Sequence, residues 1–168
     1  IPNIPAFQIS KQFQCLGPNN TTTTACAAGT QAVGEGAEYI RRGVADIVLA
    51  GGTEALVMEL VAGAFAAMRA LATSYNQRPQ AASRPFNADR EGFVLAEGSA
   101  ILVLENLDHA EQRGARIYAE VIGHSSSSDA FDIAAMRPDG SGAIHAMQGA
   151  LADAGLEPRA VGYINAHG

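Results

Sequence analysis

The sequence predicts a layered α/β fold with mostly parallel sheets covered by helices on both faces. Hydrophobic residue types make up 48% of the 168 residues and charged types 17%, which is typical of a globular chain that can bury a core. Extended apolar runs alternate with stretches whose apolar residues recur at helical spacing. The run from Asp46 to Gly52 is almost continuously apolar, as in a parallel strand that is buried on both faces.

A strand, a helix and a second strand are expected between residues 21 and 52. The β-branched run Thr21–Thr24 predicts a strand that leads into Ala25 and Cys26. Helical spacing follows, Gly43 suits the end of the helix, and residues 46–52 form the next strand. The predicted apolar face of the helix is Cys26, Thr30, Val33, Ala37 and Ile40, and its predicted polar face is Gln31, Glu35, Glu38 and Arg42.

The remaining elements continue the alternation of helices and strands. The pattern predicts a helix over 56–71, a long polar loop over 73–89, and strands over 93–104, 117–123 and 161–165. Two shorter signals mark helix ends: Asn106 caps a helix that stops at Gly114, and Ser141 caps one that stops at Gly155.

Charge and cysteine content exclude several classes of protein. The net charge is −6 and only 11 Lys and Arg are present, so we expect neither a nucleic acid partner nor an anionic membrane surface. No apolar stretch of membrane-spanning length and no targeting segment is evident, which favours a soluble, cytoplasmic protein. Cys15 and Cys26 are too few for a disulfide framework, and we expect no metal and no other cofactor. Because the chain opens at Ile1 without methionine and stops at Gly168 after a strand-like run, we expect truncation at both ends.

Cys26 is the candidate nucleophile. A cysteine at the junction of a strand and a helix lies near the positive end of the helix dipole, which favours thiolate over thiol. Its neighbours Ala25, Ala27, Ala28 and Gly29 are small and leave room for a substrate and for backbone N–H groups that face an oxyanion. A free cysteine is also commonly a small buried hydrophobic residue, and position alone does not decide between the two. Cys15 is interpreted as a packed thiol.

His167 is the candidate partner of Cys26. It follows the predicted strand 161–165, and open α/β sheets gather their ligand groups at the carboxyl ends of strands. A neutral imidazole there can exchange hydrogen bonds with a thioester or enolate oxygen. A packing role for His167 remains the alternative.

Five ordered sequence blocks resemble the β-ketoacyl-[acyl carrier protein] synthase II family over essentially the whole chain. Blocks that share order, spacing and both reactive residue types are far more specific than a single short motif. The blocks are Thr24–Gly29, Ala50–Glu54, Pro79–Phe86, Asp89–Gly98 and Asn165–Gly168.

The resemblance implies a thiolase-like layered αβαβα fold, of which only the middle portion is present, and decarboxylative condensation as the activity. Residues about 1–104 would end the N-terminal half and about 105–168 would begin the C-terminal half. Cys26 would carry the acyl chain, and His167 would assist decarboxylation of malonyl-[acyl carrier protein] to give a 3-oxoacyl product in fatty acid biosynthesis. The expected partners are acyl carrier protein in its acyl and malonyl forms and a second copy in a homodimer. Because the family's second histidine and its lysine would lie beyond Gly168, we expect the fragment alone to be inactive.

The same resemblance places Phe65 and Phe93 on the wall of an acyl tunnel, with core packing as the alternative. Arg84 and Arg90 suit either a buried ion pair with Asp89 or Glu91, which we favour, or recognition of a phosphate.

Three rival functions share this fold. A polyketide ketosynthase would differ mainly in its substrate. A chain-length-factor subunit would lack the nucleophile, so Cys26 argues against that role, and a thiolase would carry a different motif around its cysteine.

Overall fold

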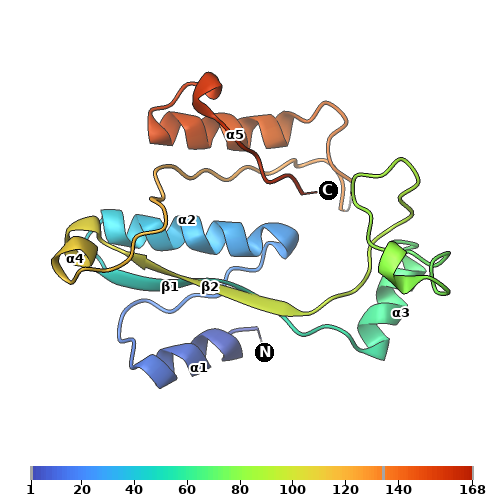
Figure 1. Ribbon diagram of the computed structural model, residues 1–168, viewed down its shortest axis with the longest axis horizontal. Helices are drawn as coiled ribbons and strands as arrows, with labels where there is room; N and C mark the ends of the chain where they lie inside the picture. The colour runs from blue at the N-terminus through green and yellow to red at the C-terminus, as the bar shows by residue number, and fades with distance from the viewer. Residues whose placement is uncertain (1, 134, 168) are drawn as a thin grey trace. The chain divides into compact units, whose positions relative to one another are not determined.

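The computed structural model describes residues 2–133 and 135–167 (Figure 1). Ile1 and Gly168, which bound the predicted domain, lie outside the described residues. The chain divides into two compact units, one of Ile1–Gly52 with Ile101–Ile164 and one of Thr53–Ala100 with Asn165–Gly168. The predicted nucleophile therefore belongs to the first unit and the predicted histidine to the second.

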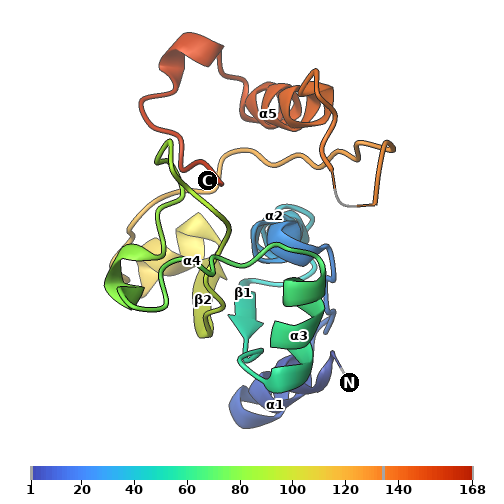
Figure 2. The same ribbon diagram turned by 90° about the vertical axis from the view of Figure 1, so that its right-hand side faces the viewer.

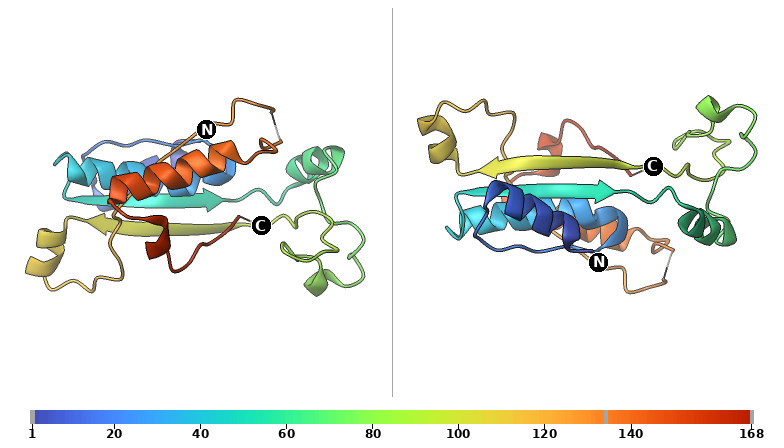
Figure 3. Two further views of the ribbon diagram at one scale, coloured as in Figure 1. Left: turned by 90° about the horizontal axis from the view of Figure 1, so that it is seen from above. Right: turned by 90° about the horizontal axis from the view of Figure 1, so that it is seen from below.

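The first unit contains most of a sheet of two strands, β1 (Ile47–Glu54) and β2 (Gly98–Glu105). The two strands run antiparallel (Figure 3), which differs from the parallel arrangement expected for the apolar run in β1. A continuous apolar run reports that both faces are covered, and it carries no information on the direction of the neighbouring strand. The predicted strand 46–52 matches β1 closely, whereas β2 begins at Gly98 and not at Phe93 as predicted.

Helix α2 (Ala28–Arg41) packs on one face of this sheet. Ala37 of α2 is buried against Ala50 and Leu104 of the strands, and Val33, Ile40 and Val48 pack around these three residues. Gly36 allows the close approach, because a Cβ built there would lie 3.0 Å from Leu104 and 3.1 Å from Val48. The predicted helix and the central part of its apolar face are thus confirmed.

Helix α1 (Ile4–Phe13) lies on the opposite face of the sheet (Figure 2) and was not predicted. Its signal was available, since a proline in the first turn is favourable at a helix start and Pro5 occupies that turn. Gln14 ends the helix in a left-handed conformation with φ of 54°. Cys15 follows and is exposed, so its interpretation as a packed thiol was wrong: the neighbouring Leu16 is 97% exposed, and this corner covers no core.

An extended segment, residues 117–124, runs between α2 and helix α5 (Ser141–Ala154) in the same unit (Figures 1 and 2). The ring of His124 lies directly over Gly34 of α2, and Gly123 lies against Ala150 and Ala154 of α5. Arg41 of α2 donates to Asp153 of α5 at 2.8 Å. The order of layers in this unit is therefore helix, sheet, helix, extended chain, helix.

Three predicted strands are extended segments in the structure. Residues 21–24, 117–123 and 161–165 have no strand ladder with any part of the chain that the structure describes. A β-branched or alternating sequence favours an extended backbone, but a strand exists only where a neighbouring strand supplies the hydrogen bonds. The extended conformation was predicted correctly and the pairing was not.

Helix ends follow local sequence signals closely. Asn106 Oδ1 accepts from the His109 backbone N–H at 3.3 Å at the start of α4 (Leu107–Gln112). Gly114 and Gly155 both have positive φ, which ends α4 and α5 as expected. The cap of α5 is Gly140 rather than Ser141, whose N–H bonds to the Asp139 carboxylate at 3.0 Å instead.

The second unit holds α3 (Glu59–Ala67) and the polar loop that follows it. The helix is shorter than the predicted 56–71, because Met58 is extended and Arg69 has φ of 56°. Leu71 and Phe93 form a parallel bridge that closes the loop. No helix in the described ranges is long and apolar enough to cross a membrane.

Candidate active site

Cys26 sits in a tight turn that leads directly into α2. Residues Ala25–Ala27 form one turn of 3-10 helix, and the Ala27 N–H donates to the Thr24 carbonyl at 3.1 Å. The thiol-bearing residue is exposed, so it is not enclosed in apolar packing. The position before a helix of 14 residues also places Cys26 close to the positive end of the helix dipole. The turn therefore presents a reachable thiol just before a helix, as predicted, although no strand precedes it in the described residues.

The backbone before the thiol is strained. Ala25 has φ of 49°, in the left-handed region that a residue with a Cβ rarely adopts. Such a conformation costs on the order of 1–3 kcal/mol and persists where surrounding contacts enforce it, often at functional sites. Sequence reasoning missed this feature, because alanine gives no local signal for positive φ.

The extended residues that precede the turn are tied to α2 by side chains. Asn20 Nδ2 donates to the Tyr39 hydroxyl at 2.6 Å, and Thr22 Oγ1 donates to Glu35 Oε2 at 3.2 Å. Gln31 Nε2 donates to the other oxygen of Glu35 at 2.8 Å. Glu35 is partly buried here, whereas the sequence pattern placed it on a plain polar face. These contacts replace the strand ladder expected for residues 21–24.

His167 belongs to the second unit, where it follows Asn165. The strand that was expected to position it is an extended segment, as described above. The convergence of His167 with Cys26 on one pocket thus stays a prediction.

Phe65 and Phe93 contact each other within the second unit. Their ring centroids are 5.0 Å apart with an interplanar angle of 83°, an edge-to-face pair. Such pairs contribute about 0.5–1.5 kcal/mol beyond the area that they bury. Two backbone hydrogen bonds hold Phe93. Its N–H donates to the Ala70 carbonyl at 2.9 Å, and its carbonyl accepts from the Ala72 N–H at 3.0 Å. The two predicted acyl-wall residues therefore share one small aromatic cluster.

The segment beside Phe93 is fastened by Glu91. Its carboxylate accepts from the N–H and hydroxyl groups of both Thr73 and Ser74, at 2.8 to 3.2 Å. These hydrogen bonds hold the pKa of Glu91 below its usual value. The bond from the Ser74 N–H has the largest effect, followed by the bonds from Thr73. Glu91 stays ionised and anchors the loop that follows α3.

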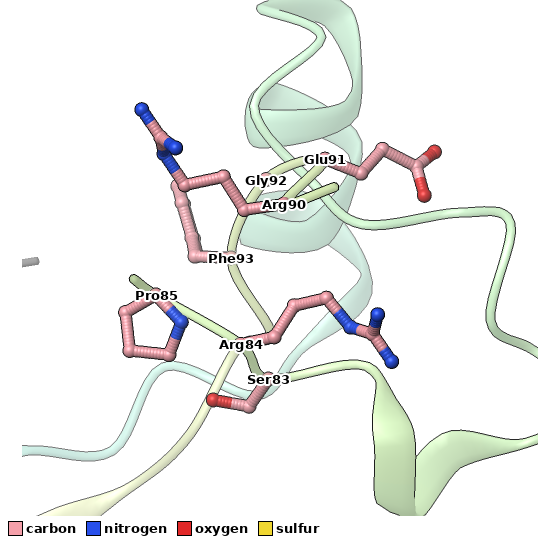
Figure 4. Close-up of a pocket in the computed structure, with 7 residues that line it drawn as sticks. All are labelled: Ser83, Arg84, Pro85, Arg90, Glu91, Gly92 and Phe93. Carbon is pink, nitrogen blue, oxygen red and sulfur yellow. The ribbon is translucent and has the colours of Figure 1, made fainter. Parts of the chain in front are cut away.

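A pocket of about 400 Å³ lies beside this segment (Figure 4). Arg84 forms an ion pair with Asp89, and its guanidinium carbon lies 4.2 Å from the centre of the Tyr75 ring. Arg90 donates to the Asn87 carbonyl at 3.1 Å. The guanidinium groups of Arg84 and Arg90 point apart, so they do not converge on one phosphate. The structural interpretation of Arg84 is supported, although Asp89 is exposed rather than buried.

Comparison with protein families identifies the chain. Residues 1–110 match the model described as "Beta-ketoacyl synthase, N-terminal domain", and residues 118–168 match "Beta-ketoacyl synthase, C-terminal domain". The chain belongs to the β-ketoacyl synthase family.

Relatives of this β-ketoacyl synthase chain include 3-oxoacyl-[acyl-carrier-protein] synthase 2 of Rhizobium meliloti. The two are 49% identical over 166 residues, which cover 99% of this chain and 39% of that protein. A synthase of the same name from Staphylococcus aureus is 46% identical over 168 residues and is covered to 41%. The chain thus spans about two fifths of the length of these relatives.

Solved structures of ketosynthases show the same fold. A β-ketoacyl synthase from Burkholderia phymatum STM815 superposes with a TM-score of 0.92 at 39% identity, covering 100% of this chain and 40% of that one. A type II PKS acyl-carrier protein in complex with its ketosynthase bound to the hexaketide gives a TM-score of 0.93 at 42% identity, covering 97% and 40%. The fold of the β-ketoacyl synthase chain is therefore the thiolase-like layered fold.

Proposed function

We propose that this chain is the nucleophile-bearing part of a longer enzyme that condenses an acyl group with malonyl-[acyl carrier protein]. The observation that carries the proposal is the exposed Cys26 in a strained turn at the start of α2. Family membership and the similarity to 3-oxoacyl-[acyl-carrier-protein] synthases support fatty acid synthesis as the pathway.

The reaction uses Cys26 twice. Its thiolate attacks the thioester carbonyl of an acyl carrier protein, and the carrier thiolate leaves, so that the acyl group is held on Cys26. Malonyl carrier protein then loses CO₂ and leaves an enolate, whose carbon attacks the Cys26 thioester. A carbon–carbon bond forms, the carbon–sulfur bond breaks, and the free thiolate is restored with a 3-oxoacyl carrier protein as product. The Cys26 backbone N–H is the proposed donor to the oxyanion of each tetrahedral intermediate.

His167 is the proposed stabiliser of the malonyl half-reaction. A neutral imidazole donates a hydrogen bond to the malonyl thioester oxygen, which becomes the enolate oxygen as CO₂ departs. This role needs His167 beside the thioester of the donor substrate and not beside the acyl chain. It therefore predicts that acyl loading and decarboxylation depend on different residues.

The pair of Phe65 and Phe93 is the proposed wall for the acyl chain. Each methylene buried against such a wall contributes about 0.8 kcal/mol, so a long chain is held by contact area alone. Replacing Phe65 by alanine should change the ratio of kcat/KM for long and short acyl carriers, and an unchanged ratio would leave the pair a packing contact only.

The proposed partners are acyl carrier protein in both forms and a second copy of the enzyme. The complex of a related ketosynthase with its acyl-carrier protein supports the first. For the second, β2 pairs only with β1 among the described strands, and Ile101, Leu102 and Val103 are 39 to 61% exposed. Such an apolar strand invites pairing with another copy; a monomeric mass by light scattering would reject the homodimer.

The halves of the fold are proposed to meet at the end of β2, with about 1–104 in the first and about 105–168 in the second. Limited proteolysis that cuts elsewhere and leaves this junction intact would argue against that division. The enzyme is proposed to be cytoplasmic, which cell fractionation tests.

A polyketide ketosynthase is the second candidate, favoured by the close structural similarity to the PKS complex. Identity to the fatty acid synthases is higher, at 46 to 49% against 42%. Product analysis separates the two, because a fatty acid enzyme performs one condensation per acyl group whereas a polyketide enzyme extends an unreduced chain repeatedly. A chain-length-factor role is disfavoured by the exposed Cys26.

The deciding experiment compares Cys26→Ala and His167→Ala in the full-length enzyme. Mass spectrometry of the intact protein should show no acyl-enzyme for Cys26→Ala after incubation with acyl carrier protein. The His167→Ala enzyme should still be acylated but should release little ¹⁴CO₂ from labelled malonyl carrier protein. Persistent acylation of Cys26→Ala would reject the nucleophile, and equal loss of both steps in His167→Ala would reject the role of the histidine.

A further inference from the structure

The strained turn at Cys26 lies between two segments that are tied together. Residues 20–22 run alongside α2, and the chain then reverses through Ala25–Ala27 into the first turn of that helix. Gln31, Glu35 and Tyr39 are spaced four residues apart, so they lie along one face of α2. Thr22 bonds to Glu35, and Asn20, which is earlier in the chain, bonds to Tyr39, which is later in α2. The two segments therefore run in opposite directions.

We propose that Glu35 is a positioning residue for the nucleophile, which holds the turn at Cys26 in its strained form through Thr22. This rests on the proposed function of Cys26. Without an anchor, the turn could relax by returning Ala25 from φ of 49° to negative φ. A change of that size would re-aim the following residue, which is Cys26.

The geometry makes Glu35 the central member of the anchor. Its two carboxylate oxygens are each engaged, one by Thr22 at 3.2 Å and one by Gln31 at 2.8 Å. The bond from Gln31 fixes the Glu35 carboxylate on the helix. The bond from Thr22 then holds Thr22 against that carboxylate, only three residues before Ala25. Both bonds are partly buried, where hydrogen bonds compete less with water.

Glu38 provides a matched control on the same helix. It is exposed, lies one turn further along α2, and its ion pair is to Arg41 at 3.9 Å. Glu38→Ala removes the same carboxylate from the same helix without touching Thr22. Cys15 is an internal control, because it is also exposed but lies before the anchored segment.

The test measures the rate at which iodoacetamide alkylates Cys26 relative to Cys15 in the full-length enzyme, with peptide mass spectrometry to separate the two thiols. Glu35→Ala should lower the relative rate for Cys26 several-fold, because a relaxed turn re-aims the sulfur and changes its surroundings and its access to the reagent. Thr22→Val, which keeps the shape and loses the hydroxyl, should have the same effect. Glu35→Gln should react as wild type, because its amide oxygen still accepts from Thr22 while its NH₂ group donates to the side-chain oxygen of Gln31 once that amide turns over. Glu38→Ala should also react as wild type.

A second background separates positioning from general stabilisation. Glycine adopts positive φ without strain, so in Ala25→Gly the turn no longer needs the anchor. The effect of Glu35→Ala on the relative rate should then be much smaller than in the Ala25 enzyme. An equal effect in both backgrounds would overturn the proposal, as would a fall in Tm of Glu35→Ala with an unchanged relative rate.

These outcomes are distinct from failure of the proposed function. Alkylation requires neither a carrier protein nor condensation, so the series reports on the turn alone. If the wild-type enzyme formed no acyl-Cys26, the proposed function would fail whatever the alkylation rates. If acyl-Cys26 formed but the Glu35 variants alkylated as Glu38→Ala does, only the positioning role would fail.

Discussion

Glu105 at the end of β2 shows how single side chains connect the elements. Its carboxylate accepts two hydrogen bonds from Arg113, at 2.6 and 2.7 Å, and one contact from His109 Nδ1 at 2.5 Å. These contacts lower the pKa of Glu105 to about 2. The bonds from Arg113 have the largest effect, and the contact with His109 acts in the same direction. The planar guanidinium matches a carboxylate in this two-bond geometry, which makes the pair stronger than a single ion contact.

The direction of the shift predicts how this pair responds to pH. A carboxyl whose pKa is about 2 in the folded state and 4.5 in the unfolded state stabilises the fold above pH 4.5, and that stabilisation is lost as the pH falls toward 2. Glu105→Gln should therefore lower the free energy of unfolding at neutral pH and make a progressively smaller difference below pH 4.5. Urea unfolding of the wild type and of Glu105→Gln between neutral pH and about pH 2 measures this difference in the free energy of unfolding. A difference that stays constant at all pH values would contradict the lowered pKa of Glu105.

At the same scale, the sequence singles out Cys26 more readily than the residues that contact its turn. A cysteine among small residues before a helical pattern is unusual, and Cys26 is exposed, as a nucleophile requires, so its role stays a prediction that the structure allows. Glu35 was missed as a support because its spacing on α2 matches an ordinary polar face. Its contact with Thr22 joins residues 13 positions apart, and periodicity within one helix carries no information about such a contact.

At the scale of elements, helix ends were predictable and strand pairing was not. Helix ends depend on the backbone of one residue and on its near neighbours, as at Asn106, Gly114 and Gly155. A short stretch of sequence is therefore enough to predict them. The segments 21–24 and 117–123 were predicted as strands from side-chain type alone. Their environment is set by distant parts of the chain, and α2 supplies it for the first of them.

The contact of residues 117–124 with α5 leads to a prediction at this scale. A Cβ at Gly123 would lie 2.4 Å from the Ala150 carbonyl oxygen and 2.9 Å from the Ala154 N, both backbone atoms that cannot easily move. Gly123→Ala should destabilise the protein by about 1–3 kcal/mol, the usual cost of overpacking. Gly162, in another extended segment, has open space around a built Cβ and is the matched control.

Chemical denaturation of the two glycine variants measures this difference. Gly162→Ala should be close to wild type, and Gly123→Ala should unfold at clearly lower denaturant concentration with the same slope. Equal midpoints for the two variants would show that the segment is not packed against α5.

At the scale of the whole molecule, the layer between α2 and α5 is incomplete within the described chain. Neighbouring apolar side chains along it remain open: Ile117 is 45% exposed, Tyr118 82%, Val121 40% and Ile122 50%, and in the later segment Tyr163 is 82% and Ile164 64% exposed. Exposure of neighbouring apolar residues is what unpaired strands of a sheet that is covered on both faces would show. The relatives are about two and a half times as long, since this chain covers 39 to 41% of their length.

We therefore expect residues 117–122 and 161–164 to pair with strands supplied by the rest of the longer enzyme. Hydrogen exchange of that enzyme should show their amides protected to the same degree as those of β1 and β2, and at least about a hundredfold more than amides of the polar loop 83–90, because only laddered N–H groups require opening before exchange. The loop is an internal reference, since it lies within the same chain and holds few backbone hydrogen bonds in the described structure. Exchange of residues 117–122 as fast as that of the loop would mean that the extended layer never becomes a sheet. The turn at Cys26 would be unaffected by that outcome, because the contacts of Asn20 and Thr22 with α2 do not involve this layer.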